Sequence, residues 1–519
     1  MYLTQGLKRA RQFRGNGRAV IFGERKRTWN EVVDRIARLA ALFRSLGLAD
    51  GDRVAMLAHS SDRYLEFYYA PLWAGGVMVP LNTRLAVPET VALLEDCTPA
   101  ILLVDDAFRD QVPDILRGAP CVRHVIWAGE GPAPEGMIDY EAAIAATAPI
   151  EDRLRGGNDL ACLFYTGGTT GRAKGVMLSH DNLSANSMNA FANMGFNEDT
   201  VHLHSGPLFH LAAGSRVYTI TFGAGTHVII PRFTPEAFLE AIQRHRVNAA
   251  VIVPTMATMI LALPNLNDYD LSSIESFSYG AAPMPEALVL RVMELLPRAK
   301  LLQSYGMTEL SPVCSTLPHR YHATTGPRAG KLNSAGRATY SAEMRIVDAE
   351  DRELPPGEIG EIVVRGPMVM LGYWNQPEQT AEALRGGWMH TGDAGYMDEE
   401  GFVFLVDRVK DMIITGGENV YSTEVENAIY KYPSVRECAV IGIPDERWGE
   451  AVHAIVVPRA GCEIAPEEVI EHCRALIAGY KCPRSVEVRR EPLPLSPANK
   501  IHKVVLREPY WKGRARRVN

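Results

Sequence analysis

The stretch Tyr165–Gly175, YTGGTTGRAKG, has the composition of a phosphate-binding loop. Glycines let a ligand approach the backbone closely, threonine hydroxyls can donate hydrogen bonds, and a lysine such as Lys174 can neutralise negative charge. The Walker A pattern of P-loop ATPases and kinases requires G-x-x-x-x-G-K-[ST], whereas here two residues separate Gly171 from Lys174. The loop therefore indicates phosphate chemistry of another kind, although taken alone it is also typical of a flexible turn.

Segments with strand and helix patterns alternate before and after this loop. Thr28–Glu31 reads as a capping box for a helix that ends at Gly47, and the strand-like segment Arg53–Ala58 follows it. The same alternation continues to about residue 305, which predicts an α/β fold of parallel-rich sheets covered by helices. Ligands of such folds commonly bind at the carboxyl ends of the strands.

The pattern changes after about Gly357. Short strands bounded by glycine predict a β-rich, barrel-like part, and after Lys410 helix, hairpin, helix and strand patterns predict a small α+β unit. We therefore expect a large N-terminal domain at 1–408, a hinge at 409–411 and a small mobile C-terminal domain at 412–519.

Composition argues against some classes of function. With 47% hydrophobic and 22% charged residues and a net charge of -7, the chain is typical of a globular protein and not of a nucleic-acid-binding one. The long uncharged span that begins near Val247 contains Pro254 and Pro264, which predict a strand, a turn and a core helix instead of a membrane span. The N-terminus lacks the apolar region of a signal peptide, and the cysteines show no C-x-x-C spacing. We expect a cytoplasmic protein, and whether it forms a homodimer stays open.

The phosphate-type loop is the first of an ordered series of motifs. It is followed by SYGAAPMP (278–285), QSYGMTE (303–309), GWMHTGD (387–393), DRVKDMIITGGENVYSTEVE (407–426) and LPLSPANKI (493–501). Together these resemble, over nearly the whole chain, the adenylate-forming superfamily of acyl-CoA synthetases, 4-coumarate:CoA ligases and luciferases. Acyl- and aryl-CoA ligases are the best match. The resemblance implies ATP, Mg²⁺ and coenzyme A as ligands and a small carboxylic acid as the substrate.

The resemblance also implies roles for individual residues. Gly167 stands where the family has Ser and Ala173 where it has Pro, so one hydroxyl donor is lost from the loop. The residues implied for ATP or AMP are Thr166, Gly167, Gly168, Thr169, Thr170 and Gly171 in the loop, Gly280, Ala281, Ala282 and Pro283 near adenine, and Tyr305, Gly306, Asp393 and Arg408 around adenine and ribose. The implied catalytic residues are Lys500, Glu309, Thr308, His210 and Lys174, with Glu309 holding Mg²⁺.

Two half-reactions follow from the resemblance. The acid attacks the α-phosphate of ATP to give acyl-AMP and pyrophosphate, and a thiol then attacks the acyl-AMP. The C-terminal domain is expected to rotate about Lys410 between them, which would withdraw Lys500 and bring Gly416, Gly417 and Glu418 towards coenzyme A. Lys503 is the nearby competitor of Lys500, which follows Asn499 where the pattern has Gly.

The acid itself stays open. His210, Ala212, Ala213, Pro312 and Val313 occupy the positions that line the acyl pocket in the family, and small apolar walls favour a medium- or long-chain fatty acid or an aryl-propenoic acid. Arg216, expected at the surface as most arginines are, could instead bind the second carboxylate of a malonate-type acid. Three further readings stay open: a carrier protein as the acceptor, a luciferase-like oxidation, and a nucleotide-sensing or scaffold protein that only retains the fold.

Overall fold

The structure is a computed structural model that describes residues 1–166, 173–408, 412–415, 418–495 and 501–512. Arg408 is described in its backbone only. Some of the residues to which the sequence gives a role therefore lie outside the described residues. They are Gly167, Gly168, Thr169, Thr170, Gly171, Lys410, Gly416, Gly417 and Lys500.

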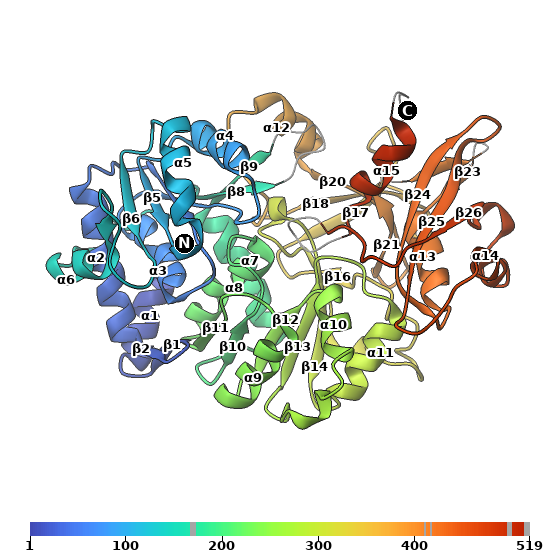
Figure 1. Ribbon diagram of the computed structural model, residues 1–519, viewed down its shortest axis with the longest axis horizontal. Helices are drawn as coiled ribbons and strands as arrows, with labels where there is room; N and C mark the ends of the chain where they lie inside the picture. The colour runs from blue at the N-terminus through green and yellow to red at the C-terminus, as the bar shows by residue number, and fades with distance from the viewer. Residues whose placement is uncertain (167–172, 409–411, 416–417, 496–500, 513–519) are drawn as a thin grey trace.

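Two large sheets dominate the N-terminal part of the chain (Figure 1). In the first, most neighbouring strands are parallel, and antiparallel pairs occur towards its edges. Its strands in spatial order are β16 (Arg337–Ala338), β15 (Ser315–Leu317), β14 (Lys300–Tyr305), β13 (Ser276–Gly280), β12 (Ala249–Ile252), β10 (Val201–His204), β11 (Thr226–Ile229), β1 (Arg18–Phe22) and β2 (Arg25–Thr28).

The second sheet carries the glycine-rich loop motif. Its central strands are parallel, but β8 and β9 pair antiparallel as a hairpin that brackets residues 167–173. Its strands in spatial order are β19 (Gly372–Tyr373), β9 (Lys174–Ser179), β8 (Leu160–Thr166), β4 (Val77–Pro80), β3 (Arg53–Leu57), β5 (Ile101–Val104), β6 (His124–Trp127) and β7 (Ile138–Asp139).

Two further sheets follow along the chain. The predicted β-rich part is an antiparallel sheet of β17 (Glu343–Val347), β18 (Gly360–Arg365), β20 (Met389–Met397) and β21 (Val403–Arg408). The C-terminal sheet contains β23 (Glu418–Val420), β22 (Ile413–Thr415), β25 (Gly449–Pro458), β24 (Val435–Asp445) and β26 (Ser485–Val488). In Figure 1 these C-terminal strands lie together with α13–α15, apart from the blue N-terminal sheet.

Helices cover both large sheets. The helices are α1 (Gln5–Arg14), α2 (Trp29–Ser45), α3 (Asp62–Trp73), α4 (Val87–Cys97), α5 (Val112–Gly118), α6 (Tyr140–Ala146), α7 (His180–Met194), α8 (Leu211–Phe222), α9 (Pro235–His245), α10 (Pro254–Leu261), α11 (Glu286–Leu295), α12 (Pro377–Ala383), α13 (Ser422–Tyr430), α14 (Pro466–Arg474) and α15 (Lys503–Trp511). The predicted capping box at Thr28 is present, and it starts α2. Two aromatic side chains of α3, Tyr68 and Tyr69, pack edge-on against Tyr218 of α8 in the main core.

The α/β fold class that the sequence predicts is confirmed. The uncharged span from Val247 forms β12 and α10, which begins at Pro254, as its prolines predict. Within the described ranges no helix is both long enough and apolar enough to cross a membrane. The small C-terminal unit has hydrophobic clusters of its own around Val425 and Val440 and around Ile441 and Leu506.

Candidate active site

Several residues of the motifs lie at strand ends. Thr166, Gly280 and Tyr305 are the last residues of β8, β13 and β14. A side chain at Gly280 would place its Cβ 2.2 Å from the carbonyl oxygen of Ser304 on the neighbouring strand. Gly306 has φ +153°, and its Cβ would lie 2.0 Å from the Pro312 carbonyl oxygen. Only glycine fits these two close approaches of the backbone.

Tyr305 and Asp393 meet although they lie in different sheets. The Tyr305 hydroxyl donates a hydrogen bond to Asp393 Oδ2 at 2.8 Å. Burial, together with the Asp393 carboxylate, raises the pKa of Tyr305 well above its usual value, so the hydroxyl stays protonated and donates. Asp393 pairs in register with Arg408 of β21, and its amide donates to Thr391 Oγ1 at 3.1 Å. The structure therefore brings three residues assigned to adenine and ribose into one region.

Glu309 is the second centre of the site. It lies in a short 3₁₀ turn just after β14 and is only 6% exposed. The Tyr373 hydroxyl donates to Glu309 Oε1 at 2.9 Å, and this carboxylate contributes with burial to raising the pKa of Tyr373. Lys174 Nζ lies 4.7 Å from the centre of the Tyr373 ring. One tyrosine thus contacts the carboxylate and the ammonium group to which the sequence assigns catalytic roles.

Tyr373 is held in place through its neighbour Trp374. The Trp374 amide donates to the Gly175 carbonyl at 2.7 Å, which docks β19 on β9. Trp374 Nε1 donates to the carbonyl of Asp96 at 3.0 Å, and the Tyr165 hydroxyl donates to the carboxylate of Asp96 at 2.5 Å. The end of α4 therefore anchors both strands that flank the loop.

The residues assigned to the acyl pocket lie around the start of α8. His210 is the residue before α8, and its carbonyl accepts from the Gly214 amide at 2.8 Å. Ala212 is exposed, whereas Ala213 is buried. Gly214, the next residue along α8, leaves no open space, because a Cβ there would lie 1.8 Å from the Tyr68 hydroxyl.

Pro312 and Val313 follow the 3₁₀ turn that contains Thr308 and Glu309. Pro312 is buried and Val313 partly buried. The Val313 carbonyl accepts a hydrogen bond from Asn186 of α7 at 2.8 Å, so this wall of the expected pocket is fixed against the helix that packs on α8.

The expected surface position of Arg216 is wrong. Arg216 lies on α8 and is 3% exposed, because α8 packs between other elements and is buried almost throughout. Its Nε and Nη1 atoms form no hydrogen bond with any described residue. Burial lowers the pKa of Arg216 to about 10. Arginine is rarely buried in this way without a partner.

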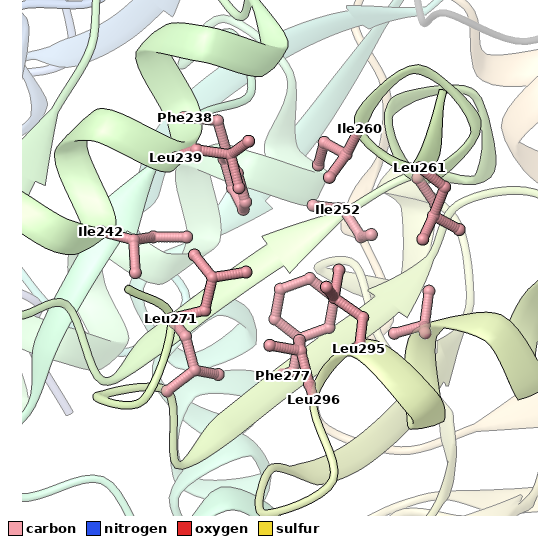
Figure 2. A pocket seen from close by; sticks show the side chains of 13 residues that line it. Phe238, Leu239, Ile242, Ile252, Ile260, Leu261, Leu271, Phe277, Leu295 and Leu296 are labelled. Atoms are coloured by element: carbon pink, nitrogen blue, oxygen red, sulfur yellow. The ribbon is translucent and has the colours of Figure 1, made fainter. Parts of the chain in front are cut away.

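Two small cavities in the described part of the chain differ in their relation to the site. One, of about 20 Å³, is lined entirely by apolar side chains of α9, α10, α11, the adjacent strands β12 and β13, and the loop before β13 (Figure 2). It contains none of the residues assigned to the site and is a packing void of the core. The other, of about 10 Å³, is lined by Asn189, Ala190, Asn193, Met194, Arg216, Ser304, Val313, Thr316 and Thr339. It includes Val313, one of the residues assigned to the acyl pocket.

Lys503, the alternative to Lys500 for the catalytic lysine, contacts other side chains. Its Nζ donates to Ser422 Oγ at 2.6 Å and forms an ion pair with Glu426 at 2.7 Å. Both partners lie on α13, so Lys503 joins α15 to α13. In the same C-terminal unit, Glu418 is exposed and pairs in register with Thr415.

Sequence reasoning missed Tyr373, Trp374 and Asp96. The stretch LGYWN around residue 373 shows no periodicity or charge pattern that would have marked it. Its role depends on the pairing of β19 with β9, which joins segments far apart in the chain.

The comparisons with known proteins agree with this geometry. Residues 7–374 match the sequence model of the AMP-binding enzyme family and residues 424–500 that of the AMP-binding enzyme C-terminal domain. The chain is 41% identical over 486 residues to a feruloyl-CoA synthase of Amycolatopsis sp, which covers 93% of this chain and 94% of that protein. It is 35% identical over 518 residues to an indoleacetate–CoA ligase of Aromatoleum aromaticum, which covers 98% of both.

Among solved structures, ATP-bound MatB from Rhodopseudomonas palustris superposes with a TM-score of 0.89 at 33% identity and covers 99% of both chains. These relatives confirm the predicted superfamily and, with it, the predicted class of ATP-dependent acid–CoA ligase. The chain belongs to the AMP-binding enzyme family.

Proposed function

We propose that this chain activates an aryl-substituted acid, with an aryl-propenoic acid as the leading candidate, and transfers the acyl group to coenzyme A. Two hydrogen bonds carry the adenylation step: Tyr305 to Asp393, and Tyr373 to Glu309. Tyr305 and Glu309 lie only four residues apart in the chain, so the two contacts lie close together. The identity of 41% to a feruloyl-CoA synthase, against 34–35% to fatty-acid ligases, supports an aromatic acid over the fatty acid that the sequence left open.

In the first half-reaction an oxygen of the acid attacks the α-phosphorus of ATP, and the bond to the pyrophosphate oxygen breaks. Tyr305 and Asp393 would hold adenine and ribose, with Gly280–Pro283 against the base. Lys174, next to the loop motif, would face the phosphates together with Thr166 and Thr308. Negative charge grows on the attacked phosphate, and Lys174 and Lys500 would stabilise it.

Glu309 could serve as one ligand of Mg²⁺, but protein side chains alone would not complete its coordination. Within the described ranges no group of three or more His, Cys, Asp or Glu side chains could hold a metal. A single buried carboxylate oriented by Tyr373 suits a hard cation whose other ligands are phosphate oxygens and water. When bound, Mg²⁺ would supply charge neutralisation on the phosphates.

In the second half-reaction the sulfur of coenzyme A attacks the acyl carbon, and AMP leaves with its phosphate. We propose that Lys410 is the hinge between 1–408 and 412–519, and that Gly416, Gly417 and Glu418 then line the path of the thiol. The two family matches leave residues 375–423 between them, and Lys410 lies in that interval.

The test is a two-stage assay on the intact chain. ATP–pyrophosphate exchange would be measured with ferulate, cinnamate, indoleacetate, octanoate, palmitate and acetate, followed by loss of free thiol when coenzyme A is added. We expect exchange and thioester formation to be strongest with the aryl acids. Exchange with none of the acids would overturn adenylation, and fatty acids at the head of the series would overturn the aryl assignment.

Exchange without thiol loss would overturn coenzyme A as the acceptor and favour a carrier protein. We also propose that the protein works in the cytoplasm, where ATP and coenzyme A are available, and as a homodimer. The mass of the protein in dilute solution tests the latter, and a monomer would contradict it.

A further inference from the structure

The small cavity beside α8 is unusual because its lining is polar and in part unpartnered. Three of the residues that line it are Arg216, Ser304 and Thr339. Within the described part of the chain, no hydrogen-bond partner contacts Nε and Nη1 of Arg216, Oγ of Ser304 or Oγ1 of Thr339. Buried polar groups are nearly always hydrogen-bonded, so an unpartnered group is evidence for a partner that is not part of the chain. Three such residues around one cavity point to a ligand.

The cavity is also positively charged. Arg216 is the cation, and no carboxylate of a described residue opposes the lowering of its pKa by burial. The neighbouring His202 and His204 are kept neutral, because burial and the charge of Arg216 both lower their pKa values. A buried guanidinium without a counter-charge costs free energy, which an incoming acceptor oxygen, above all an anionic one, would recover.

One residue of the cavity lining is adjacent in the chain to Tyr305, and another belongs to the expected acyl pocket. Ser304 immediately precedes Tyr305, whose hydroxyl bonds Asp393, and Val313 belongs to the expected pocket wall. Arg216 lies six residues after His210 on α8, which at 1.5 Å per residue is about 9 Å along the helix axis. A rigid aryl-propenoic acid can span such a depth, whereas acetate and malonate are too short.

We propose that Arg216 determines specificity by donating hydrogen bonds to an oxygen at the far end of the acid, remote from the carboxylate that reacts. This rests on the proposed function and narrows it to acids with a distal acceptor, such as a phenolic oxygen or a second carboxylate. Ser304 and Thr339 add hydroxyls at the same end. The cavity of about 10 Å³ has room for at most one water molecule, so side chains that line it, Arg216 among them, must move to admit the acid.

The test compares pairs of acids that differ only at the far end. The pairs are 4-hydroxycinnamate with cinnamate, 4-carboxycinnamate with cinnamate, and octanedioate with octanoate, each measured as kcat/KM for acyl-AMP formation. In the wild type we expect the oxygenated member to be favoured, and in Arg216→Met we expect this ratio to fall roughly 10- to 100-fold. The 4-carboxy pair tests an anionic acceptor, and the 4-hydroxy pair a neutral one.

Three controls separate the explanations. Arg216→Lys keeps the charge without the planar fork and should retain part of the preference. Arg291→Met, on the exposed surface of α11, should leave the ratios as in the wild type. Because Nε and Nη1 of Arg216 have no partner among the described residues, Arg216→Met should unfold at the wild-type temperature or above it. A clear fall would show that the chain itself holds the guanidinium, and would overturn the proposal.

Failure of this inference is distinguishable from failure of the proposed function. One outcome is that the acids react with kcat/KM ratios near one, and another is that Arg216→Met leaves the ratios unchanged. In either case Arg216 binds water only and the inference is overturned. If only the octanedioate–octanoate pair responds to Arg216→Met, the inference stands and the aryl assignment is overturned.

Discussion

The Tyr373 hydroxyl donates a 2.9 Å hydrogen bond to Glu309 across an interval of 64 residues, and the same ring lies beside Lys174. The carboxylate proposed to hold Mg²⁺ is therefore oriented by a side chain that belongs to none of the motifs of the sequence. A group that orients a ligand in this way is a positioning residue.

Tyr373→Phe should impair adenylation while the ring still packs beside Lys174. Loss of one hydrogen bond to a charged group is expected to lower kcat/KM for adenylation roughly tenfold and to raise the Mg²⁺ concentration needed for half-maximal rate. Tyr432→Phe is the matched control, because it removes an exposed tyrosine–glutamate hydrogen bond to Glu468 far from the site. An unchanged Mg²⁺ dependence in Tyr373→Phe would contradict the positioning role.

Lys500→Ala should suppress acyl-AMP formation by orders of magnitude and spare thioester formation from supplied acyl-AMP. The reason is that its charge is needed only while pyrophosphate leaves. Lys503→Ala is the control: it breaks the link between α15 and α13, so it should lower the unfolding temperature without separating the two half-reactions. Normal pyrophosphate exchange in Lys500→Ala would refute the assignment.

Lys410→Pro should separate the half-reactions in the opposite sense. Proline fixes φ near -65°, so the backbone could no longer rotate about φ at this residue. We expect pyrophosphate exchange to persist and transfer to coenzyme A to fail in single-turnover measurements. Equal slowing of both half-reactions would place the hinge elsewhere.

Acidification should destabilise the fold through buried neutral histidines, with His322 as the one to test. The Tyr279 hydroxyl donates to His322 Nε2 at 3.0 Å, and burial lowers the His322 pKa from 6.5 to about 4. Between these values the unfolded chain binds a proton that the folded chain does not. This contribution is therefore complete above pH 6.5 and is lost as the pH falls towards 4, at most about 3 kcal/mol.

The measurement is the unfolding temperature from pH 7.5 to pH 5. It should fall with pH in the wild type and fall less in His322→Gln, whereas His124→Gln, at the start of β6, should follow the wild type. Parallel curves for His322→Gln and the wild type would contradict the role of His322.

Local pattern was enough to predict the α/β fold, and the resemblance of the motifs to a known superfamily implied the region where Tyr305 and Asp393 meet. Both residues belong to motifs with a recognisable spacing, and strand ends in parallel sheets gather ligands. Tyr373 and Asp96 escaped prediction because their roles arise from the pairing of β19 with β9 and from the position of α4. Arg216 was expected at the surface because most arginines are exposed. It is buried instead, because α8 packs between other elements.

The register of the β8–β9 hairpin limits how this protein can vary in evolution. Thr166 pairs with Lys174, so the side chain of Lys174 faces Tyr373 only while that pairing is kept. A deletion of one residue within β9 would turn the side chains after it to the opposite face of the sheet. Homologous chains should therefore keep a constant length within Lys174–Ser179, so that Lys174 stays beside the ring of Tyr373.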